Sequence, residues 1–193
     1  MRGAIRTLRG VRGRDLWQET PRAWASGGAG LWLNPRLSQP LCETLLRADY
    51  PALADHIWLA ASGTSGSVKV VALARAALES SAAAVNNHLG AGPADCWLNP
   101  LPLFHVGGLG ILVRAAMAGS RCEILQDWNA QDFVRRVAEC GATLSALVPA
   151  QVHDLVVAGH PAPPSLRAVV VGGGALDDSL HERAAELGWP LLP

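Results

Sequence analysis

From residue 56 onward, short apolar runs alternate with helical patterns, and this alternation limits the possible folds more than any other feature of the sequence. Apolar runs of strand length occur at residues 56–61, 69–73, 96–101, 121–125, 143–148 and 166–171. Patterns of helical period occupy residues 75–89, 109–118, 130–139, 151–157 and 178–187. Strands that alternate with helices of this length pair in parallel through right-handed crossovers. The sequence therefore predicts an α/β fold with a mostly parallel sheet flanked by helices.

The first fifty residues lack this regularity. Tryptophans, glycines and prolines are scattered through them, and only residues 39–48 have the pattern of a short helix, which ends before Pro51. We therefore divide the chain into an irregular or helical leader, residues 1–50, and an α/β region, residues 51–193.

Composition excludes several classes of protein. Half of the 193 residues are hydrophobic and 17% are charged, which is typical of a globular chain and not of a disordered one. The 16 basic and 16 acidic residues balance, so binding to nucleic acid through bulk charge is not expected. No apolar run is long enough to span a membrane, and no signal peptide is evident. The four cysteines form no C-x-x-C pair. We expect a cytoplasmic protein with buried free thiols and no metal site.

A loop rich in glycine and hydroxyl groups separates the first two predicted strands and carries the only lysine of the chain, Lys69. Glycines let backbone N–H groups approach an anion closely, hydroxyl groups add donors, and a lysine adds positive charge. The predicted phosphate ligands are Ser62, Gly63, Thr64, Ser65, Gly66, Ser67 and Lys69. A flexible hairpin loop is the alternative. A Walker A loop is excluded, because no Gly-Lys-Ser/Thr has the required spacing.

A second loop, residues 100–109, combines two prolines with an aromatic residue, a histidine and two glycines. The candidate site residues are Phe104, His105, Gly107 and Gly108. For His105 alone, a hydrogen-bonded structural histidine is the alternative.

A third loop follows the last strand, where Gly172, Gly173, Gly174 and Ala175 leave room for a flat ligand against the backbone. A glycine-rich turn is the alternative. The dinucleotide fingerprint needs a glycine at position 177, where Asp177 stands instead.

Together and in this order, the three loops resemble signatures of the adenylate-forming superfamily, which includes acyl-CoA synthetases. Residues 61–70 are similar to its phosphate loop, T-S-G-T-T-G-x-P-K-G, and depart from it at Ala61, Val68 and Val70. Residues 102–108, Pro-Leu-Phe-His-Val-Gly-Gly, resemble the second signature, and residues 172–176 resemble the later Gly-Gly-Ala motif. The similarity extends over residues 56–193.

The resemblance implies an ATP-dependent acid–CoA ligase, in which a carboxylate attacks the α-phosphate of ATP and coenzyme A then displaces AMP. It implies that Lys69 and residues 62–67 hold the β- and γ-phosphates with Mg²⁺, and that His105 lies between the acid and the nucleotide. It also places Phe104, Gly107 and Gly108 at the acid, and residues 172–175 beside the adenine. The short leader and residues 97–105 most resemble the branch that activates 2-succinylbenzoate in menaquinone biosynthesis.

Later motifs of that superfamily, including an aromatic-Gly-x-Thr-Glu stretch and a catalytic lysine of the C-terminal domain, do not occur in the sequence. We therefore expect an N-terminal fragment with an incomplete AMP-binding domain and without the C-terminal domain, which is inactive alone. Its expected partners are a small carboxylic acid and either the missing portion or a second chain. The alternatives are a non-catalytic remnant or interaction protein that keeps the fold, and an unrelated nucleotide-binding NTPase.

Overall fold

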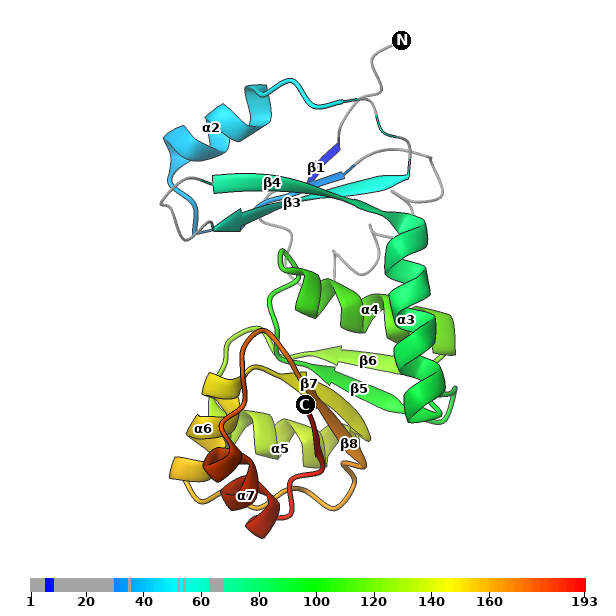
Figure 1. Ribbon diagram of the computed structural model, residues 1–193, viewed down its shortest axis with the longest axis vertical. Coiled ribbons are helices and arrows are strands. Elements are labelled where there is room, and N and C mark those ends of the chain that lie inside the picture. Colours follow the sequence, from blue (N-terminus) through cyan, green and yellow to red (C-terminus); the bar gives the residue numbers. More distant parts are fainter. Residues whose placement is uncertain (1–5, 9–29, 35, 52, 54, 63–67) are drawn as a thin grey trace. The chain divides into compact units, whose positions relative to one another are not determined.

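The computed structural model describes residues 6–8, 30–34, 36–51, 53, 55–62 and 68–193 (Figure 1). The chain divides into two compact units, each with its own sheet. The first unit contains the residues up to 80 together with 103–106, and the second contains residues 81–102 and 107–193. Helix α3 (Arg75–Leu89) contains one of the boundaries between them.

The first unit is built on a four-stranded sheet with the order β1-β2-β3-β4. Its strands are β1 (Arg6–Leu8), β2 (Gly30–Trp32), β3 (His56–Ser62) and β4 (Val68–Ala74). Strands β1, β2 and β3 are parallel, whereas β4 runs antiparallel to β3 because a short connection can only return the chain in the opposite direction. Helix α2 (Gln39–Arg47) agrees with the helix predicted at residues 39–48 and contributes Cys42 and Leu45 to the core of this unit.

The second unit contains a five-stranded parallel sheet with the order β6-β5-β7-β8-β9, which confirms the predicted α/β fold. The strands are β5 (Cys96–Asn99), β6 (Arg121–Ile124), β7 (Leu144–Leu147), β8 (Ala168–Val171) and β9 (Leu191–Leu192). The helices are α4 (Val106–Ala118), α5 (Ala130–Cys140), α6 (Pro149–Val157) and α7 (Asp178–Glu186).

Helices cover both faces of this parallel sheet (Figure 1). On one face, Trp97 and Leu144 pack with Ile111 of α4 and with Leu89 at the end of α3. The other face packs against α5, α6 and α7, with side chains that include Leu98, Leu147, Val169, Phe133 and Leu155. Because both faces are covered, every residue of β5 and of β7 is buried. This burial explains why the strands are continuous apolar runs in the sequence.

Strands β1 and β2 were not predicted, and helix α4 begins at Val106 and not at residue 109. Gly107 and Gly108 therefore lie in the first turn of a helix and not in a loop. Glycine is a poor helix former and interrupts the apolar pattern, so the pattern did not reveal this turn. Strands β5 to β8 are also shorter than predicted, and β5 ends at Asn99, two residues early, whereas β3 and β4 are slightly longer than predicted.

A charged network, here called the amino-edge clamp, joins the amino ends of β5, β7 and β8. Arg167 donates from Nε to Asp95 Oδ1 and from Nη2 to Asp95 Oδ2, both at 2.9 Å. Thr143 Oγ1 donates to Asp95 Oδ1 at 2.7 Å, and the Gly92 N–H donates to Asp95 Oδ2 at 3.0 Å. The hydrogen bond from Arg167 is the main cause that holds the pKa of Asp95 well below its usual range. The clamp therefore contains an ionised carboxylate with four donors.

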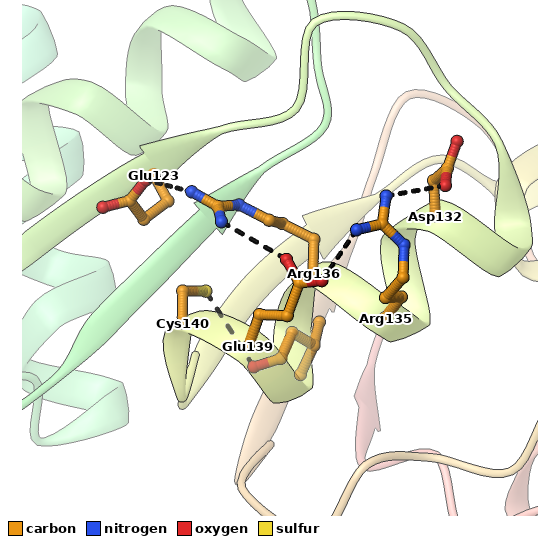
Figure 2. A network of polar contacts seen from close by, with 7 residues as sticks. Glu123, Asp132, Arg135, Arg136, Glu139 and Cys140 are labelled. Carbon is orange, nitrogen blue, oxygen red and sulfur yellow. Dashed lines mark hydrogen bonds and ion pairs between the residues drawn. The ribbon is translucent and has the colours of Figure 1, made fainter.

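A second charged network lies between α5 and β6 (Figure 2). Arg136 pairs with Glu123 at 2.8 Å and with Glu139 at 3.4 Å, while Arg135 pairs with Asp132 at 2.9 Å and with Glu139 at 2.7 Å. At least a third of each of these side chains is exposed. Exposed ion pairs contribute little stability. Among the described strands β6 lies at the edge of the sheet, and Glu123 places a charge on it, a feature that disfavours pairing with other chains.

Candidate functional site

The strand order of the second unit creates a switch point between β5 and β7. From β5 the chain passes through α4 to β6 on one side, and from β7 it passes through α6 to β8 on the other side. In parallel α/β sheets, ligands bind beyond the carboxyl ends of the strands at such a point. The loops that follow β5, β7 and β8 all leave from this edge, and two of them are candidate loops.

The loop after β5 is closed at its base by Asn99, the last residue of that strand. This side chain is fully buried. Its Nδ2 donates to the Gly108 carbonyl oxygen at 2.9 Å, and its Oδ1 accepts from the Leu101 N–H at 3.0 Å. One amide therefore holds residues on both sides of the segment that carries Phe104 and His105. Sequence reasoning missed Asn99, because residue 99 falls within the strand predicted at 96–101 and the pattern does not show which groups its amide bonds.

Gly108 is required by a close approach of two backbone segments. A Cβ atom at this position would lie 2.4 Å from the Pro102 carbonyl oxygen and 2.5 Å from the Leu101 carbonyl oxygen. At Gly107, a Cβ atom would lie 3.2 Å from Leu101 Cδ1. These two glycines thus let the start of α4 pack against the chain that leaves β5.

The His105 side chain is exposed and lies beside Phe104, with ring centroids 4.7 Å apart and an interplanar angle of 53°. Partial desolvation lowers the pKa of His105, so the imidazole is neutral near pH 7. No described residue forms a hydrogen bond or an ion pair with this ring.

The triple glycine follows β8 and lies against the connection between β7 and α6. The Gly172 N–H donates to the Leu147 carbonyl oxygen at 3.1 Å. Gly173 has a φ of +82°, and a Cβ atom there would lie 3.2 Å from Val148 Cγ1. Residues 172–175 are all exposed at the carboxyl edge. A ligand can therefore approach their backbone directly.

Asp177 occupies the position where the dinucleotide fingerprint has a glycine, and it caps helix α7. Its carboxylate accepts from the N–H groups of Ser179 at 3.0 Å and Leu180 at 3.3 Å. Asp177 therefore acts as the N-cap of α7, because its carboxylate accepts hydrogen bonds from backbone N–H groups that have no partner within the helix.

Of the phosphate loop, Gly63, Thr64, Ser65, Gly66 and Ser67 lie outside the described residues. The two ends of the loop are described: Ser62 pairs with Val68 across the antiparallel ladder, and Ala61 pairs with Lys69. Lys69 is exposed on β4. Its neighbours Val68 and Val70 pack toward the core with α2, so the alternation of the strand places Lys69 on the opposite face.

Arg114 of α4 is a second residue that sequence reasoning missed. It is half-buried, and its Cζ lies 5.9 Å from the centroid of the Trp97 ring. Burial lowers the pKa of its guanidinium, and no described carboxylate pairs with it. A desolvated cation without an acidic partner is costly and often marks a binding site. The available signal was that Arg114 is the only charged residue between positions 106 and 118.

Two buried polar atoms close to Arg114 also lack partners. Asn86 Nδ2 donates to the Arg114 carbonyl oxygen at 2.9 Å, but among the described residues neither Asn86 Oδ1 nor Trp97 Nε1 has a hydrogen-bond partner. Among the described residues there is no cluster of three His, Cys, Asp or Glu side chains that could hold a metal ion. None of the described helices has the length and apolar character needed to cross a membrane.

The second unit is a parallel sheet covered by helices, with glycine-rich loops beyond the carboxyl ends of its strands at the switch point. This architecture is that of the α/β domains that bind ligands at this edge. The family model described as AMP-binding enzyme matches residues 58–192. The chain belongs to this family.

The most similar proteins include ligases that act on 2-succinylbenzoate. The chain is 35% identical over 133 residues to the 2-succinylbenzoate–CoA ligase of Bacillus cereus (strain Q1), a stretch that covers 67% of this chain and 27% of that ligase. It therefore spans about a quarter of the length of this curated relative.

Two solved structures extend the comparison. An Escherichia coli MenE variant with bound OSB-AMS has a TM-score of 0.75 and 29% identity, covering 99% of this chain and 48% of that one. The o-succinylbenzoate CoA synthetase (MenE) of Bacillus subtilis, in complex with ATP and magnesium, has a TM-score of 0.80 and 20% identity, covering 96% of this chain and 47% of that one. The second similarity shows the fold.

Proposed function

We propose that the chain forms the phosphate- and acid-binding part of an ATP-dependent acid–CoA ligase, and that its acid is 2-succinylbenzoate. The family match and the similarity to ligases of this acid support the reaction class. The glycine-rich loops at the carboxyl edge support a site for a nucleotide and an acid in the second unit.

In this proposal the reacting acid needs no general base. A carboxylic acid has a pKa of about 4 and is already ionised near neutral pH, so its oxygen can attack the α-phosphate without losing a proton. The barrier arises because one anion approaches another, and donors fixed in place beforehand lower it. Lys69 and the hydroxyl and N–H groups of residues 62–67 would supply such donors to the phosphates.

A neutral His105 suits a positioning role in this step. Because its pKa is lowered, the ring carries one N–H donor and one acceptor near pH 7. The donor can orient a carboxylate oxygen while the ring adds no full positive charge. Phe104 lies beside the ring. Residues 172–175 present an open backbone that would accommodate the flat adenine.

Magnesium would enter as the ion of Mg-ATP. The described residues contain no cluster of carboxylates, the ligands that Mg²⁺ prefers in addition to phosphate oxygens.

Arg114 is the observation that favours 2-succinylbenzoate over a simple acid. This substrate has two carboxylates, and only one of them is consumed when the adenylate forms. The second carboxylate needs a cationic partner in a desolvated pocket. Arg114 is half-buried, has no described acidic partner and lies on the same helix as Gly107 and Gly108.

The test compares OSB-AMS with an analogue that lacks the second carboxylate, using isothermal titration calorimetry on the chain and on the longest product of its gene. We expect OSB-AMS to bind about 10- to 100-fold more tightly, because a charge-assisted hydrogen bond contributes about 1.5–3 kcal/mol. Arg114→Met should remove this difference. The control Arg135→Met, at an exposed position on α5, should preserve it.

Equal affinities for the two compounds would refute the assignment of the acid. Hydrolysis of Mg-ATP without any carboxylic acid would favour the unrelated NTPase instead. If the folded chain and the longer product bind neither compound and form no thioester, the non-catalytic remnant becomes the better explanation.

A further inference from the structure

Asn99 is the only polar residue of β5, and its position in the buried sheet requires an explanation. The other residues of the strand, Cys96, Trp97 and Leu98, are buried and apolar in character. Burial of an amide is unfavourable unless its hydrogen bonds are made. Here both ends of the amide are bonded, and both bonds go to the segment that follows the strand.

The two partners of Asn99 define the ends of that segment. The Leu101 N–H donates to it at 3.0 Å and the Gly108 carbonyl oxygen accepts from it at 2.9 Å, so the ends of the segment 102–107 are held by one side chain. The orientation of the amide is fixed by these partners, because the flipped amide would place two donors or two acceptors opposite each other. The absence of a side chain at Gly108 allows this close approach.

The looped segment carries Phe104 and His105. Residues 103–106 belong to the first unit by their packing, whereas Leu101 and Gly108 belong to the second unit. Asn99 ties together the residue before this segment and the residue after it.

We propose that Asn99 is a positioning residue of the proposed ligase reaction, which fixes the segment 102–107 so that His105 and Phe104 meet the acid in one arrangement. This inference rests on the proposed function. Asn99 touches neither the acid nor the nucleotide in this scheme, and it acts through the backbone of Leu101 and Gly108.

The test uses two variants and a matched control. Asn99→Leu has a similar volume and removes both hydrogen bonds, whereas Asn99→Asp keeps an acceptor for the Leu101 N–H and loses the donor to Gly108. The control is Ser145→Ala, which removes another fully buried hydrogen bond, from Ser145 Oγ to the Leu98 carbonyl oxygen at 2.7 Å, without touching the segment.

Three quantities are measured on the full chain: amide hydrogen exchange at Leu101, the NMR resonances of the His105 ring, and the affinity for OSB-AMS. Relative to Ser145→Ala, we expect Asn99→Leu to exchange the Leu101 amide about tenfold faster or more, to shift the His105 ring resonances and to bind OSB-AMS about tenfold more weakly. In Asn99→Asp, exchange at Leu101 should stay close to that of the wild type, while the His105 resonances shift.

The proposal is overturned if Asn99→Leu matches Ser145→Ala in all three quantities, or if Leu101 exchanges faster while the His105 resonances and the affinity stay unchanged. A wild-type chain that does not bind OSB-AMS would count against the proposed function. In that case the exchange rates and the His105 resonances still decide whether Asn99 fixes the segment.

Discussion

Replacement of Gly108 by alanine provides a sharp test of the packing at the start of α4. The added Cβ would lie 2.4 Å from the Pro102 carbonyl oxygen and 2.7 Å from the Pro102 carbonyl carbon. Favourable contacts between such atoms begin at about 3.5 Å, so the two backbone segments must separate by about 1 Å. Backbone atoms cannot rotate away as the end of a flexible side chain can. We therefore expect Gly108→Ala to destabilise the second unit.

The magnitude follows from three contributions. Overpacking costs about 1–3 kcal/mol, and a site enclosed by backbone belongs at the upper end of that range. Separation of the segments also stretches the hydrogen bond from Asn99 to the Gly108 carbonyl oxygen, which contributes about 0.5–1.5 kcal/mol. Alanine recovers up to about 1 kcal/mol through its higher helix propensity. The net loss is about 2–3 kcal/mol.

Gly110→Ala is the matched control, because Gly110 lies on the same helix with space for a side chain. A Cβ atom there would lie 3.8 Å from Arg114 Nη2, an ordinary contact. This variant should gain up to about 1 kcal/mol, so the two substitutions should have opposite signs. Thermal unfolding followed by tryptophan fluorescence measures both, and Gly108→Ala should lower the Tm by about 4–10 °C. A Gly108→Ala variant as stable as Gly110→Ala would refute the reasoning.

Three further predictions concern the second unit. Arg167→Met should cost about 2 kcal/mol near neutral pH, because it removes two hydrogen bonds to the Asp95 carboxylate. Since the pKa of Asp95 is lowered in the folded state, this stabilisation is present above about pH 4 and is lost as the pH falls, so urea unfolding curves of variant and wild type should converge in acid. Gly173→Ala should lower the Tm because of the positive φ, whereas Gly172→Ala, with open space around its Cβ, should not. Burial raises the pKa of Cys122 to about 12, so iodoacetamide at pH 8 should modify this thiol at least about a hundredfold more slowly in the folded chain than in urea, and equal rates would contradict the structure.

The regular elements could be predicted because local and tertiary preferences agree in this chain. Helix α3 begins and ends at the predicted residues, and α5 carries its own boundary signals. The Asn129 side chain accepts from the Asp132 N–H at its start, and Gly141 adopts a left-handed conformation at its end. The division into two sheets could not be predicted, because periodicity indicates which face of a strand is buried and not which strand lies beside it.

Only the glycine-rich parts of the candidate site could be predicted from the sequence. The glycines of residues 172–174 and the pair Gly107–Gly108 are conspicuous in any single sequence, and the structure places them at the carboxyl edge of the sheet. Asn99 was not predictable, because its role depends on hydrogen bonds to residues that lie on both sides of a loop. Arg114 is visible as a lone charge in an apolar helix, but only the structure shows that no described carboxylate neutralises it.

The amino-edge clamp also has a consequence for the rates of folding and unfolding. It joins Asp95 to Thr143, 48 residues away, and to Arg167, 72 residues away. Contacts between such distant residues carry a large loop-closure entropy, so the clamp closes only after β7 and β8 have joined the sheet. Interactions that are absent from the folding transition state change the unfolding rate and leave the folding rate almost unaltered. We therefore expect the clamp to set the lifetime of the folded sheet, and its loss in Arg167→Met to accelerate unfolding without slowing refolding.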